Sequence, residues 1–304
     1  MLYCLYIVIP CYNEQEVLPE TSGRVGKLLR GLMDAGRVSA ASRVVFVDDG
    51  SRDGTWELIS GLHGRDDIFS GVKLSRNRGH QNALLAGLLE GSENADVTVS
   101  MDADLQDDIT AIYEMLDKYE AGCQVVYGVR SARDTDTGFK KFTAEGFYKL
   151  TAALGGEIVY NHADFRLLGR NALDALAKYG EKNLFLRGIV PMLGYKSDIV
   201  YYKRAERFAG VSKYPLKKML SFAADGITSL SVKPLRIMGF IGLLLLVICG
   251  LTSVFLRGNA QIITTVWAAA GLILSALGLV GEYVGKTYTE TKERPRYIIE
   301  AVLK

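Results

Sequence analysis

The segment VTVSMDADLQDD, residues 97–108, begins as a buried strand and ends in a run of carboxylates. Its first residues are apolar or small, whereas Asp102, Asp104, Asp107 and Asp108 follow closely on one another. Like charges at such short spacing repel one another. The run is therefore either a solvated loop or a site where a positively charged ligand holds the carboxylates together.

Polar segments follow four apolar strands in the first 130 residues. The strands YIVIP, RVVFVDD, GVKLS, VTVSMD and QVVYGV alternate with helical spacing at 14–35, 55–62, 79–89 and 109–121. This alternation predicts an α/β fold, with a mostly parallel sheet covered on both faces. The segments PCYNE, DDGSRDGT, SRNRGHQN and DADLQDD lie at strand ends, where such sheets bind ligands. A ligand site is thus favoured over a solvated loop.

Several classes of protein are disfavoured by what the sequence does not contain. There is no G-x-G-x-x-G in the first turn, no G-x-x-x-x-G-K-[ST] and no G-x-S-x-G, which disfavours dinucleotide oxidoreductases, P-loop enzymes and serine hydrolases. The formal net charge of +2 does not indicate nucleic-acid binding. The 4 dispersed cysteines favour free thiols over disulfides or a zinc site.

The D-x-D spacing of Asp102 and Asp104 suits a hard divalent cation. Such an ion takes oxygen ligands from carboxylates and from substrate phosphates. If the backbone stays extended here, residues two apart face the same side, and both carboxylates can face one ion. A metal-bound nucleotide diphosphate would supply the positive charge that the cluster needs.

Two apolar runs near the C-terminal end predict a membrane hairpin. No charged residue occurs at 237–256 or at 258–281, and each run is long enough to cross a hydrocarbon core of about 30 Å. A pair of buried core helices is the alternative, but only RGNAQ separates the runs and neither has a polar face. Basic residues flank the hairpin on its outer sides, so the positive-inside rule predicts that both termini are cytoplasmic.

Six segments, in order, resemble membrane-bound polyprenyl-phosphate glycosyltransferases of family 2, which have a GT-A type domain. They are IVIPCYNE (7–14), VDDGSRDGT (47–55), SRNRGHQNALLAGL (75–88), DADLQD (102–107), DFRLLGR (164–170) and RFAGVSKYPLKK (207–218). They span nearly the whole chain, and they resemble bacterial bactoprenol glucosyltransferases more than dolichol-phosphate mannose synthases. The resemblance implies a GT-A domain at 1–210, an amphipathic juxtamembrane segment at 211–236, transmembrane helices at about 237–256 and 262–281, and a cytoplasmic tail at 284–304.

The resemblance implies an inverting hexosyltransferase in the bacterial inner membrane. Its expected donor is a nucleotide sugar, with UDP-glucose favoured, and its expected acceptor is undecaprenyl phosphate or a similar polyprenyl phosphate. Mg²⁺ or Mn²⁺ is the expected cofactor, and a homo-oligomer is the expected assembly. A processive polysaccharide synthase is one alternative, disfavoured by the few spans and by the missing Q-x-x-R-W motif. A catalytically inactive membrane scaffold is the other, disfavoured because the motif residues are intact.

For the donor and the metal, the resemblance implies roles residue by residue. The donor nucleotide is expected to contact Pro10, Tyr12, Asn13, Glu14, Asp48, Asp102, Arg207 and Lys213. Within this set Asp48 reads the base, and Arg207 and Lys213 close over the diphosphate as a lid. The expected metal ligands are Asp102, Asp104 and Gln106. Asp49 and Ser51 are expected only to form a capped turn before the helix at Thr55.

On the acceptor side the expected residues are cations. A lipid phosphate is already ionised at neutral pH, so it needs positioning for in-line attack and no strong general base. Arg130 is placed for that task, and so are Lys140 and Lys141, although the lysines fit an ordinary basic surface equally well. Asp164 is expected to be essential near the reacting centre, which makes Asp104, Arg130 and Asp164 the expected catalytic residues. His80 either faces the ligand or is a packed surface histidine.

Two segments have the composition of helices that lie on a membrane surface. Residues 139–154 and 214–236 mix aromatic and aliphatic residues with lysines. Packing on the core of the domain is the alternative for each. The surface position is favoured because a membrane hairpin follows directly.

Overall fold

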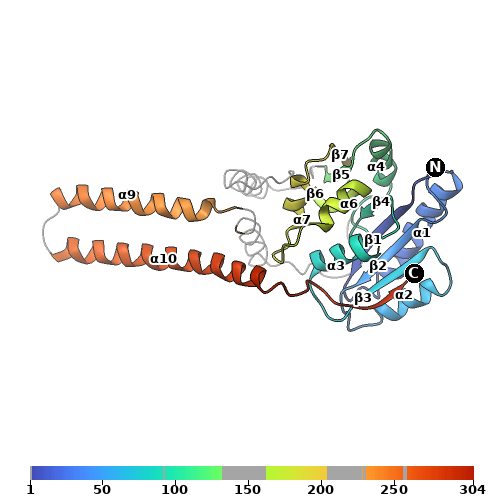
Figure 1. The fold of residues 1–304 in the computed structure, drawn as a ribbon, viewed down its shortest axis with the longest axis horizontal. Coiled ribbons are helices and arrows are strands. Elements are labelled where there is room, and N and C mark those ends of the chain that lie inside the picture. The colour runs from blue at the N-terminus through green and yellow to red at the C-terminus, as the bar shows by residue number, and fades with distance from the viewer. Residues whose placement is uncertain (1, 92, 132–161, 204–227, 229–230, 256–258) are drawn as a thin grey trace. The chain divides into compact units, whose positions relative to one another are not determined.

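The computed structural model describes the chain except for residues 1, 92, 132–161, 204–227, 229–230 and 256–258 (Figure 1). Lys140, Lys141, Arg207 and Lys213 lie outside the described residues. So do the first predicted surface helix and most of the second. The chain divides into two units, the first formed by residues 1–142, 158–213 and 295–304, the second by residues 143–157 and 214–294.

The first unit is built on an eight-stranded sheet of order β7-β5-β6-β4-β1-β2-β3-β8. Its strands are β1 (Leu5–Cys11), β2 (Arg43–Asp48), β3 (Phe69–Leu74), β4 (Val97–Ser100), β5 (Val125–Arg130), β6 (His162–Gly169), β7 (Ser197–Tyr202) and β8 (Ile299–Leu303). The pairs β1–β2, β1–β4, β2–β3 and β5–β7 are parallel. β6 runs antiparallel to β4 and β5, and β8 antiparallel to β3. The predicted mostly parallel α/β sheet is confirmed.

Helices cover both faces of the sheet. They are α1 (Leu18–Asp34), α2 (Thr55–His63), α3 (His80–Ala86), the π-helix Gly87–Gly91, α4 (Ala111–Glu120), α6 (Arg170–Ala177) and α7 (Leu186–Met192). Successive residues of a strand point to opposite faces. Ile7 and Ile9 accordingly pack in the cluster that contains the apolar residues of α1, α2 and α4. Val8 packs in the other cluster, with α3, the π-helix, α6 and α7.

The five strands predicted from the sequence are all present, and so are four helices close to their predicted ranges. The first of these helices begins at Leu18 and not at Glu14, with Pro19 in its first turn, where a missing N–H costs nothing. The predicted helix 79–89 is α3 followed by a π-helix. All four cysteines are free, as predicted. The strands β6, β7 and β8 were not predicted from the sequence.

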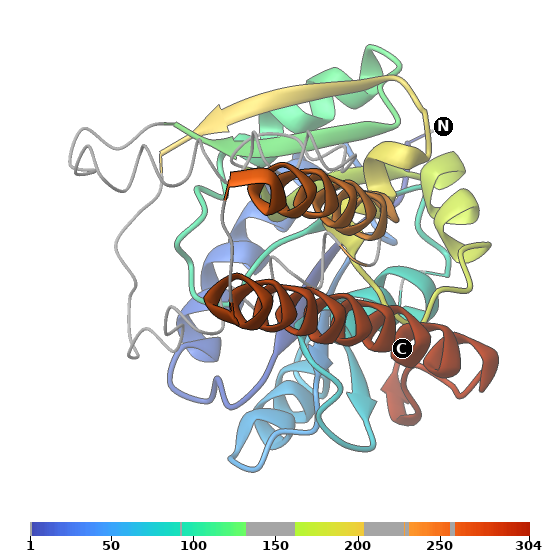
Figure 2. The same cartoon turned by 90° about the vertical axis from the view of Figure 1, so that its left-hand side faces the viewer.

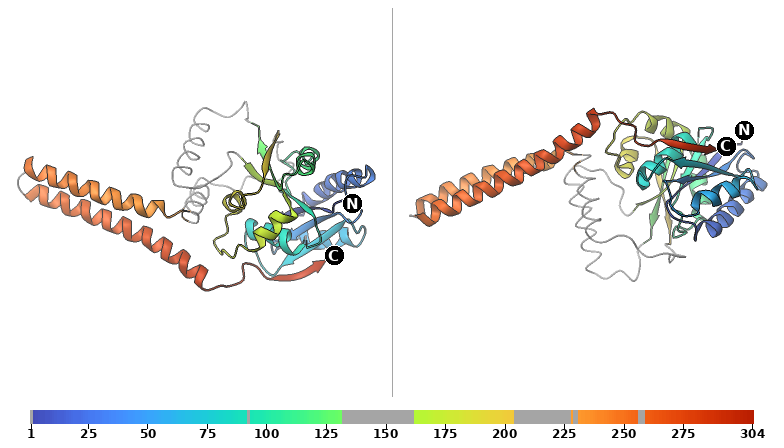
Figure 3. Two further views of the ribbon diagram at one scale, coloured as in Figure 1. Left: turned by 45° about the horizontal axis from the view of Figure 1, so that its top comes forward. Right: turned by 90° about the horizontal axis from the view of Figure 1, so that it is seen from below.

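The C-terminal end of the chain differs from the predicted tail. Residues 284–291 continue a long helix, and Ile299–Leu303 adds strand β8 to the edge of the sheet beside β3 (Figure 3). The Lys73 ammonium reaches the Glu300 carboxylate across this pair at 2.9 Å. The first and last strands of the chain therefore belong to one folded unit.

The second unit contains two long apolar helices, α9 (Lys233–Phe255) and α10 (Asn259–Thr291). The candidate spans Lys233–Leu251 and Ile262–Thr291 have mean hydropathies of 2.2 and 2.0, and their most apolar windows are 0% buried within the described structure. Helices of a soluble core would be covered by other elements. Both helices are long and apolar enough to cross a membrane, which is consistent with the predicted spans.

Replacing Gly87 by alanine should destabilise the first unit. A Cβ at this position would meet Cγ1 of Val8 and lie 2.6 Å from Cγ2 of Val47, both in buried β-branched side chains that cannot move aside. Overpacking of this kind typically costs about 1–3 kcal/mol. Gly61→Ala in α2 is the matched control, since its Cβ meets nothing within 4 Å and alanine favours a helix. Urea unfolding should separate the two variants, and equal midpoints would contradict the packing argument.

Candidate active site

The polar side chains singled out in the sequence gather at one edge of the sheet. β1, β2, β4 and β5 run in the same direction, so their carboxyl ends lie at one edge of the sheet. Asp48 and Arg130 end β2 and β5, and Asn13 and Asp102 lie in the loops after β1 and β4. β6 runs the other way between β4 and β5, so its first residues return to that same edge. The Ser100 hydroxyl donates to the Asp164 carbonyl at 2.6 Å, which places Asp164 next to the end of β4.

The loops after β1 and β2 are joined by hydrogen bonds. The N–H of Asn13 donates to the Ser51 hydroxyl at 3.0 Å, and Asn13 Oδ1 accepts the N–H of Arg52 at 2.9 Å. The N–H of Glu14 donates to Thr55 Oγ1 at 2.9 Å. Asn13 has a φ of 55°, a left-handed conformation that asparagine tolerates better than most residues. The segment that was expected to contact the donor is thus held by the neighbouring loop.

Asp49 has a different role from the one predicted. Its carboxylate accepts the N–H groups of Arg78 and Gly79 at 2.6 and 2.9 Å, so it fixes the loop after β3. The N-cap residue of α2, Gly54, makes no side-chain cap hydrogen bond, and the N–H of Thr55 donates to Asp53 Oδ1 at 3.1 Å, not to Asp49 or Ser51. The prediction that Asp49 and Ser51 form a helix-capping turn is therefore wrong. Both residues link neighbouring loops, a role that depends on contacts distant in the sequence.

Asp48 is a buried carboxylate with one unused oxygen. It is 0% exposed, and its Oδ1 accepts the N–H of Ser51 at 3.0 Å. Its Oδ2 is buried and has no hydrogen-bond partner. Burial raises the pKa of this carboxyl, against the opposing effect of the Ser51 hydrogen bonds. A buried acceptor without a donor is costly, so a ligand N–H at this position would be well matched.

The D-x-D loop is a turn and not an extended strand. β4 ends at Ser100, and the backbone turns at Ala103 and Asp104. Leu105 has a φ of 53°, a strained conformation for a bulky residue that is often found at functional sites. The backbone is therefore not extended between Asp102 and Asp104, contrary to the condition under which their carboxylates were expected to face the same side.

The loop nevertheless presents the donor atoms that a hard cation prefers. The carboxylates of Asp102 and Asp104 are partly exposed, and Gln106 adds an amide oxygen. Oδ1 of Asp104 accepts the N–H of Gln106 at 3.2 Å, which orders the turn. Among the described residues there is no group of three or more His, Cys, Asp or Glu side chains that could hold a metal ion without further ligands. The residues fit an ion that substrate phosphates help to bind.

Asp164 lies at the centre of a cationic cluster. Arg166 donates to its Oδ1, Arg187 Nη2 donates to its Oδ2 at 3.0 Å, and His80 Nε2 lies 3.4 Å from Oδ2. Although burial acts to raise it, the pKa of Asp164 is held well below its usual value by Arg187, His80 and Arg166. Asp164 is therefore ionised at neutral pH and holds Arg166, Arg187 and His80 around its carboxylate.

His80 and Arg187 are brought to Asp164 by the helices that carry them. His80 begins α3, and Arg187 lies in the first turn of α7. The N–H of Leu186 donates to Gln81 Oε1 at 2.8 Å, which joins the two helix starts. His80 Nε2 also lies 3.6 Å from Asp102 Oδ1, so the imidazole stands between the two carboxylates. Although burial lowers it, the pKa of His80 is raised overall by Asp164 and Asp102. His80 thus lies between the two carboxylates of the candidate site.

Arg130 belongs to a second polar cluster at the same edge. Its Nη2 lies 3.4 Å from Asp107 Oδ1, and its Nε donates to the Tyr202 hydroxyl at 3.2 Å. Burial, followed by the charge of Asp102, raises the pKa of Asp107 to about 6, against the opposing effect of Tyr202 and Arg130. Burial also raises the pKa of Tyr202, so its hydroxyl stays protonated and donates to Asp107.

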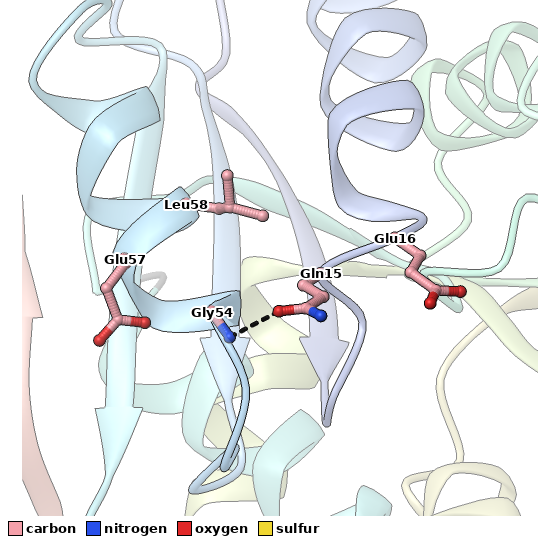
Figure 4. A pocket seen from close by; sticks show the side chains of 5 residues that line it. All are labelled: Gln15, Glu16, Gly54, Glu57 and Leu58. Carbon is pink, nitrogen blue, oxygen red and sulfur yellow. Dashed lines mark hydrogen bonds between the residues drawn. The ribbon is translucent and has the colours of Figure 1, made fainter.

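A surface depression near the first loop is lined by Gln15, Glu16, Gly54, Glu57 and Leu58 (Figure 4). The N–H of Gly54 donates to Gln15 Oε1 at 2.8 Å across it. None of these residues is among the predicted site residues. The depression offers carboxylates but no cation for a phosphate, so it does not alter the placing of the candidate site.

The structure brings most of the predicted site residues to one edge. Pro10, Tyr12, Asn13, Glu14, Asp48, Asp102, Asp104, Gln106, Arg130 and Asp164 lie at strand ends or in the loops that follow them. Sequence reasoning missed Asp107, Arg166, Arg187 and Tyr202 as parts of the site. Arg166 had one usable signal, since it lies two positions after Asp164 in a strand and shares its face. No local signal distinguishes Arg187 or Tyr202 from ordinary surface and core residues.

Comparison with known proteins gives concordant matches. The model of the family described as glycosyl transferase family 2 matches residues 6–177. An uncharacterized glycosyltransferase of Bacillus subtilis (strain 168) is 48% identical over 306 residues, covering 97% of this chain and 91% of the relative. A bactoprenol glucosyl transferase of Shigella phage SfV is 37% identical over 306 residues, covering 97% of each chain. A solved glucosyl-3-phosphoglycerate synthase of Mycobacterium tuberculosis, in complex with Mn²⁺, UDP-glucose and phosphoglyceric acid, is 18% identical. It has a TM-score of 0.49, covering 75% of this chain and 78% of that one.

Proposed function

The chain belongs to glycosyltransferase family 2, and from this premise we propose that it transfers glucose from UDP-glucose to a polyprenyl phosphate such as undecaprenyl phosphate. The observation that supports the proposal is the juxtaposition, at one sheet edge, of carboxylates suited to a divalent cation with guanidinium groups suited to a phosphate acceptor. The near-full-length likeness to a bactoprenol glucosyl transferase supports the choice of sugar and lipid.

The donor side of the site suits a nucleoside diphosphate sugar. The unpaired Oδ2 of Asp48 matches a ring N–H of a pyrimidine base such as uracil. Asp102, Asp104 and Gln106 would hold Mg²⁺ or Mn²⁺, whose charge offsets that of the leaving diphosphate. Arg207 and Lys213 lie outside the described residues, and their role as a lid over the diphosphate stays a prediction.

The acceptor side suits a phosphate that attacks the anomeric carbon directly. Its oxygen is already ionised, so the cations Arg130 and Arg187 need only orient it. Asp164 is held ionised by its own cations and is a poor proton acceptor. A single displacement without an enzyme nucleophile inverts the anomeric configuration. A product with retained configuration would overturn this mechanism.

Pairing of β8 with β3 supports the proposed membrane topology. Both strands belong to one sheet, so the N-terminal domain and the C-terminal strand lie on the same side of any membrane that the hairpin crosses. This requires an even number of crossings, and α9 with α10 supplies two. The flanking basic residues favour the cytoplasm of a bacterium as that side. Cysteine labelling from each side of sealed vesicles tests the assignment, and opposite sides for the two ends would reject it.

Radiolabel transfer into lipid tests the proposed function directly. Purified protein receives undecaprenyl phosphate and Mg²⁺, with UDP-glucose, UDP-N-acetylglucosamine, UDP-galactose and GDP-mannose in separate reactions. One labelled, acid-labile lipid in the UDP-glucose reaction is expected. Label in a water-soluble polymer would favour a processive synthase. No label in any reaction would favour an inactive scaffold.

Replacing Arg130 by alanine should weaken use of the lipid far more than use of the nucleotide sugar. Loss of a buried charge-assisted contact typically costs about 2–5 kcal/mol, which corresponds to a rise in KM for the lipid of about 30-fold or more. The KM for UDP-glucose should stay nearly unchanged. Arg24→Ala is a suitable control, because Arg24 pairs only with Glu20 on the exposed face of α1 among the described residues. Equal losses for both substrates would mean that the acceptor binds elsewhere.

A further inference from the structure

The Tyr202 hydroxyl lies between Asp107 and Arg130. It donates to Asp107 Oδ1 at 2.5 Å and accepts from Arg130 Nε at 3.2 Å. Nη2 of Arg130 lies 3.4 Å from the same carboxylate oxygen. Two nitrogens of a planar guanidinium are thereby directed at neighbouring partners, which fixes the orientation of its plane.

The backbone and the core hold Tyr202 in place for this contact. Arg130 and Tyr202 are register partners at the ends of the parallel strands β5 and β7, seen side by side in green and yellow in Figure 2. The N–H and the hydroxyl of Ser131 both donate to the Tyr202 carbonyl, at 2.9 and 3.0 Å. The phenol ring packs edge-on against Phe165 with 5.2 Å between centroids and is 4% exposed. The hydroxyl therefore has a defined position without any ligand.

Asp107 joins this cluster to the metal-binding loop. It directly follows Gln106, its side chain is 1% exposed, and its Oδ1 contacts both Tyr202 and Arg130. A movement of the loop that carries Asp102, Asp104 and Gln106 would therefore move the anchor of Arg130 as well. The segment 102–107 therefore positions both the proposed metal ligands and, through Asp107, the Arg130 guanidinium.

The geometry points to Tyr202 as a positioning residue for Arg130, with Asp107 as the anchor. Tyr202 does not touch the substrate. It holds the guanidinium of Arg130 in the orientation that binds the phosphate of the lipid acceptor, in register with the donor held by the D-x-D loop. This inference rests on the proposed function, because the proposed function assigns Arg130 to the acceptor phosphate.

Tyr202→Phe removes the hydroxyl and leaves the ring that packs on Phe165. The KM for undecaprenyl phosphate should rise about tenfold, as expected for loss of a hydrogen bond to a charged group. The KM for UDP-glucose should change less than about twofold, within the scatter of such measurements. Tyr201→Phe is the matched control, since Tyr201 is the next residue of the same strand and is 69% exposed. Unchanged KM values for Tyr202→Phe, or equal rises for both substrates, would overturn the inference.

A double-mutant cycle separates positioning from a general structural effect. In an Arg130→Ala background, Tyr202→Phe should cause no further loss of lipid affinity, because the group through which it acts is gone. Additive losses would show that Tyr202 acts independently of Arg130 and would overturn the inference. The thermal midpoint of Tyr202→Phe gives a check on folding, and Asp107→Asn offers a second variant that weakens the same anchor.

Binding of a short-chain polyprenyl phosphate, measured by calorimetry without donor, distinguishes this inference from the proposed function. If the unaltered protein binds the lipid and Tyr202→Phe binds it about tenfold more weakly, the inference holds. If both proteins bind it equally, the inference fails and the proposed function stands. If the unaltered protein neither binds nor glycosylates the lipid, the proposed acceptor is wrong and the inference falls with it.

Discussion

Asp104→Asn should reduce metal-dependent sugar transfer by at least about 100-fold, since a bound ion contributes several kcal/mol of charge stabilisation to the transition state. Asparagine keeps the size of the side chain and an oxygen that can accept the N–H of Gln106, so the turn can form. It removes the negative charge that attracts a hard cation. The loss should therefore arise in metal binding and turnover and not in folding.

Transfer rates at increasing Mn²⁺ concentration, together with Mn²⁺-dependent binding of UDP, measure this effect. Asp108→Asn is the matched control, because Asp108 is exposed in the same loop. Its Oδ1 accepts hydrogen bonds from the N–H and the hydroxyl of Thr110. The control should keep its metal response. Near-normal turnover of Asp104→Asn would remove Asp104 from the metal site.

Asp164→Asn should lower kcat by about 100-fold, since small displacements of positioning groups have effects of this size. The carboxylate holds Arg187, Arg166 and His80 around one point, and Arg166 is almost fully buried. Neutralising the carboxylate leaves these cations without their shared anion. A buried charge that loses its partner typically costs about 3–5 kcal/mol, so a lower stability is expected as well.

Arg187→Gln gives the second variant that keeps this prediction testable if Asp164→Asn folds poorly. Arg187 is one-third exposed, so its loss should leave the fold intact while lowering turnover. If Asp164 acts by holding Arg187, the double variant should lose little more than the single variants lose. Multiplicative losses would assign the two residues to separate roles.

The pH dependence of turnover distinguishes positioning from general-base catalysis. A carboxyl with a depressed pKa stays ionised as the pH falls, until the pH reaches that low value. Asp164 should therefore cause no change in kcat between about pH 6 and pH 9, far above its titration. An ascending limb in this range that disappears in Asp164→Asn but remains in His80→Gln would instead identify Asp164 as a base with a near-neutral pKa, because Asp164→Asn also changes the titration of His80.

Much of the fold could be predicted because its signals are local. Apolar strands of four to seven residues alternate with helical periodicity, and the polar segments come at the strand ends, where parallel sheets bind ligands. The two apolar runs were visible for the same reason, since length and composition are properties of a segment. The residues predicted to bind the donor and the metal, among them Asn13, Asp48, Asp102 and Asp104, lie within these segments.

The rest depended on contacts between distant parts of the chain. The hydrogen-bond register inserts β6 antiparallel between β4 and β5, and this brings Asp164 to the end of β4, where His80 lies between it and Asp102. The hydrogen bond from the N–H of Leu186 to Gln81 Oε1 links α7 to α3 and brings Arg187 to the carboxylate of Asp164. Neither arrangement affects the spacing of apolar residues within the segments involved, so neither could be predicted from that spacing.

By itself, then, the sequence determined the strands β1 to β5, the helices between them, the two apolar C-terminal runs and the polar residues that end those strands or follow them. The tertiary structure decided which of these residues meet. It made Asp49 a link between loops and not a cap, and it placed Asp104 in a turn and not on an extended strand. It also brought the Tyr202 hydroxyl from β7 to Arg130 and added the C-terminal segment to the edge of the sheet as β8. The physical reason is that propensity and periodicity act within a few residues, whereas pairing and ion contacts join residues that only the folded chain brings together.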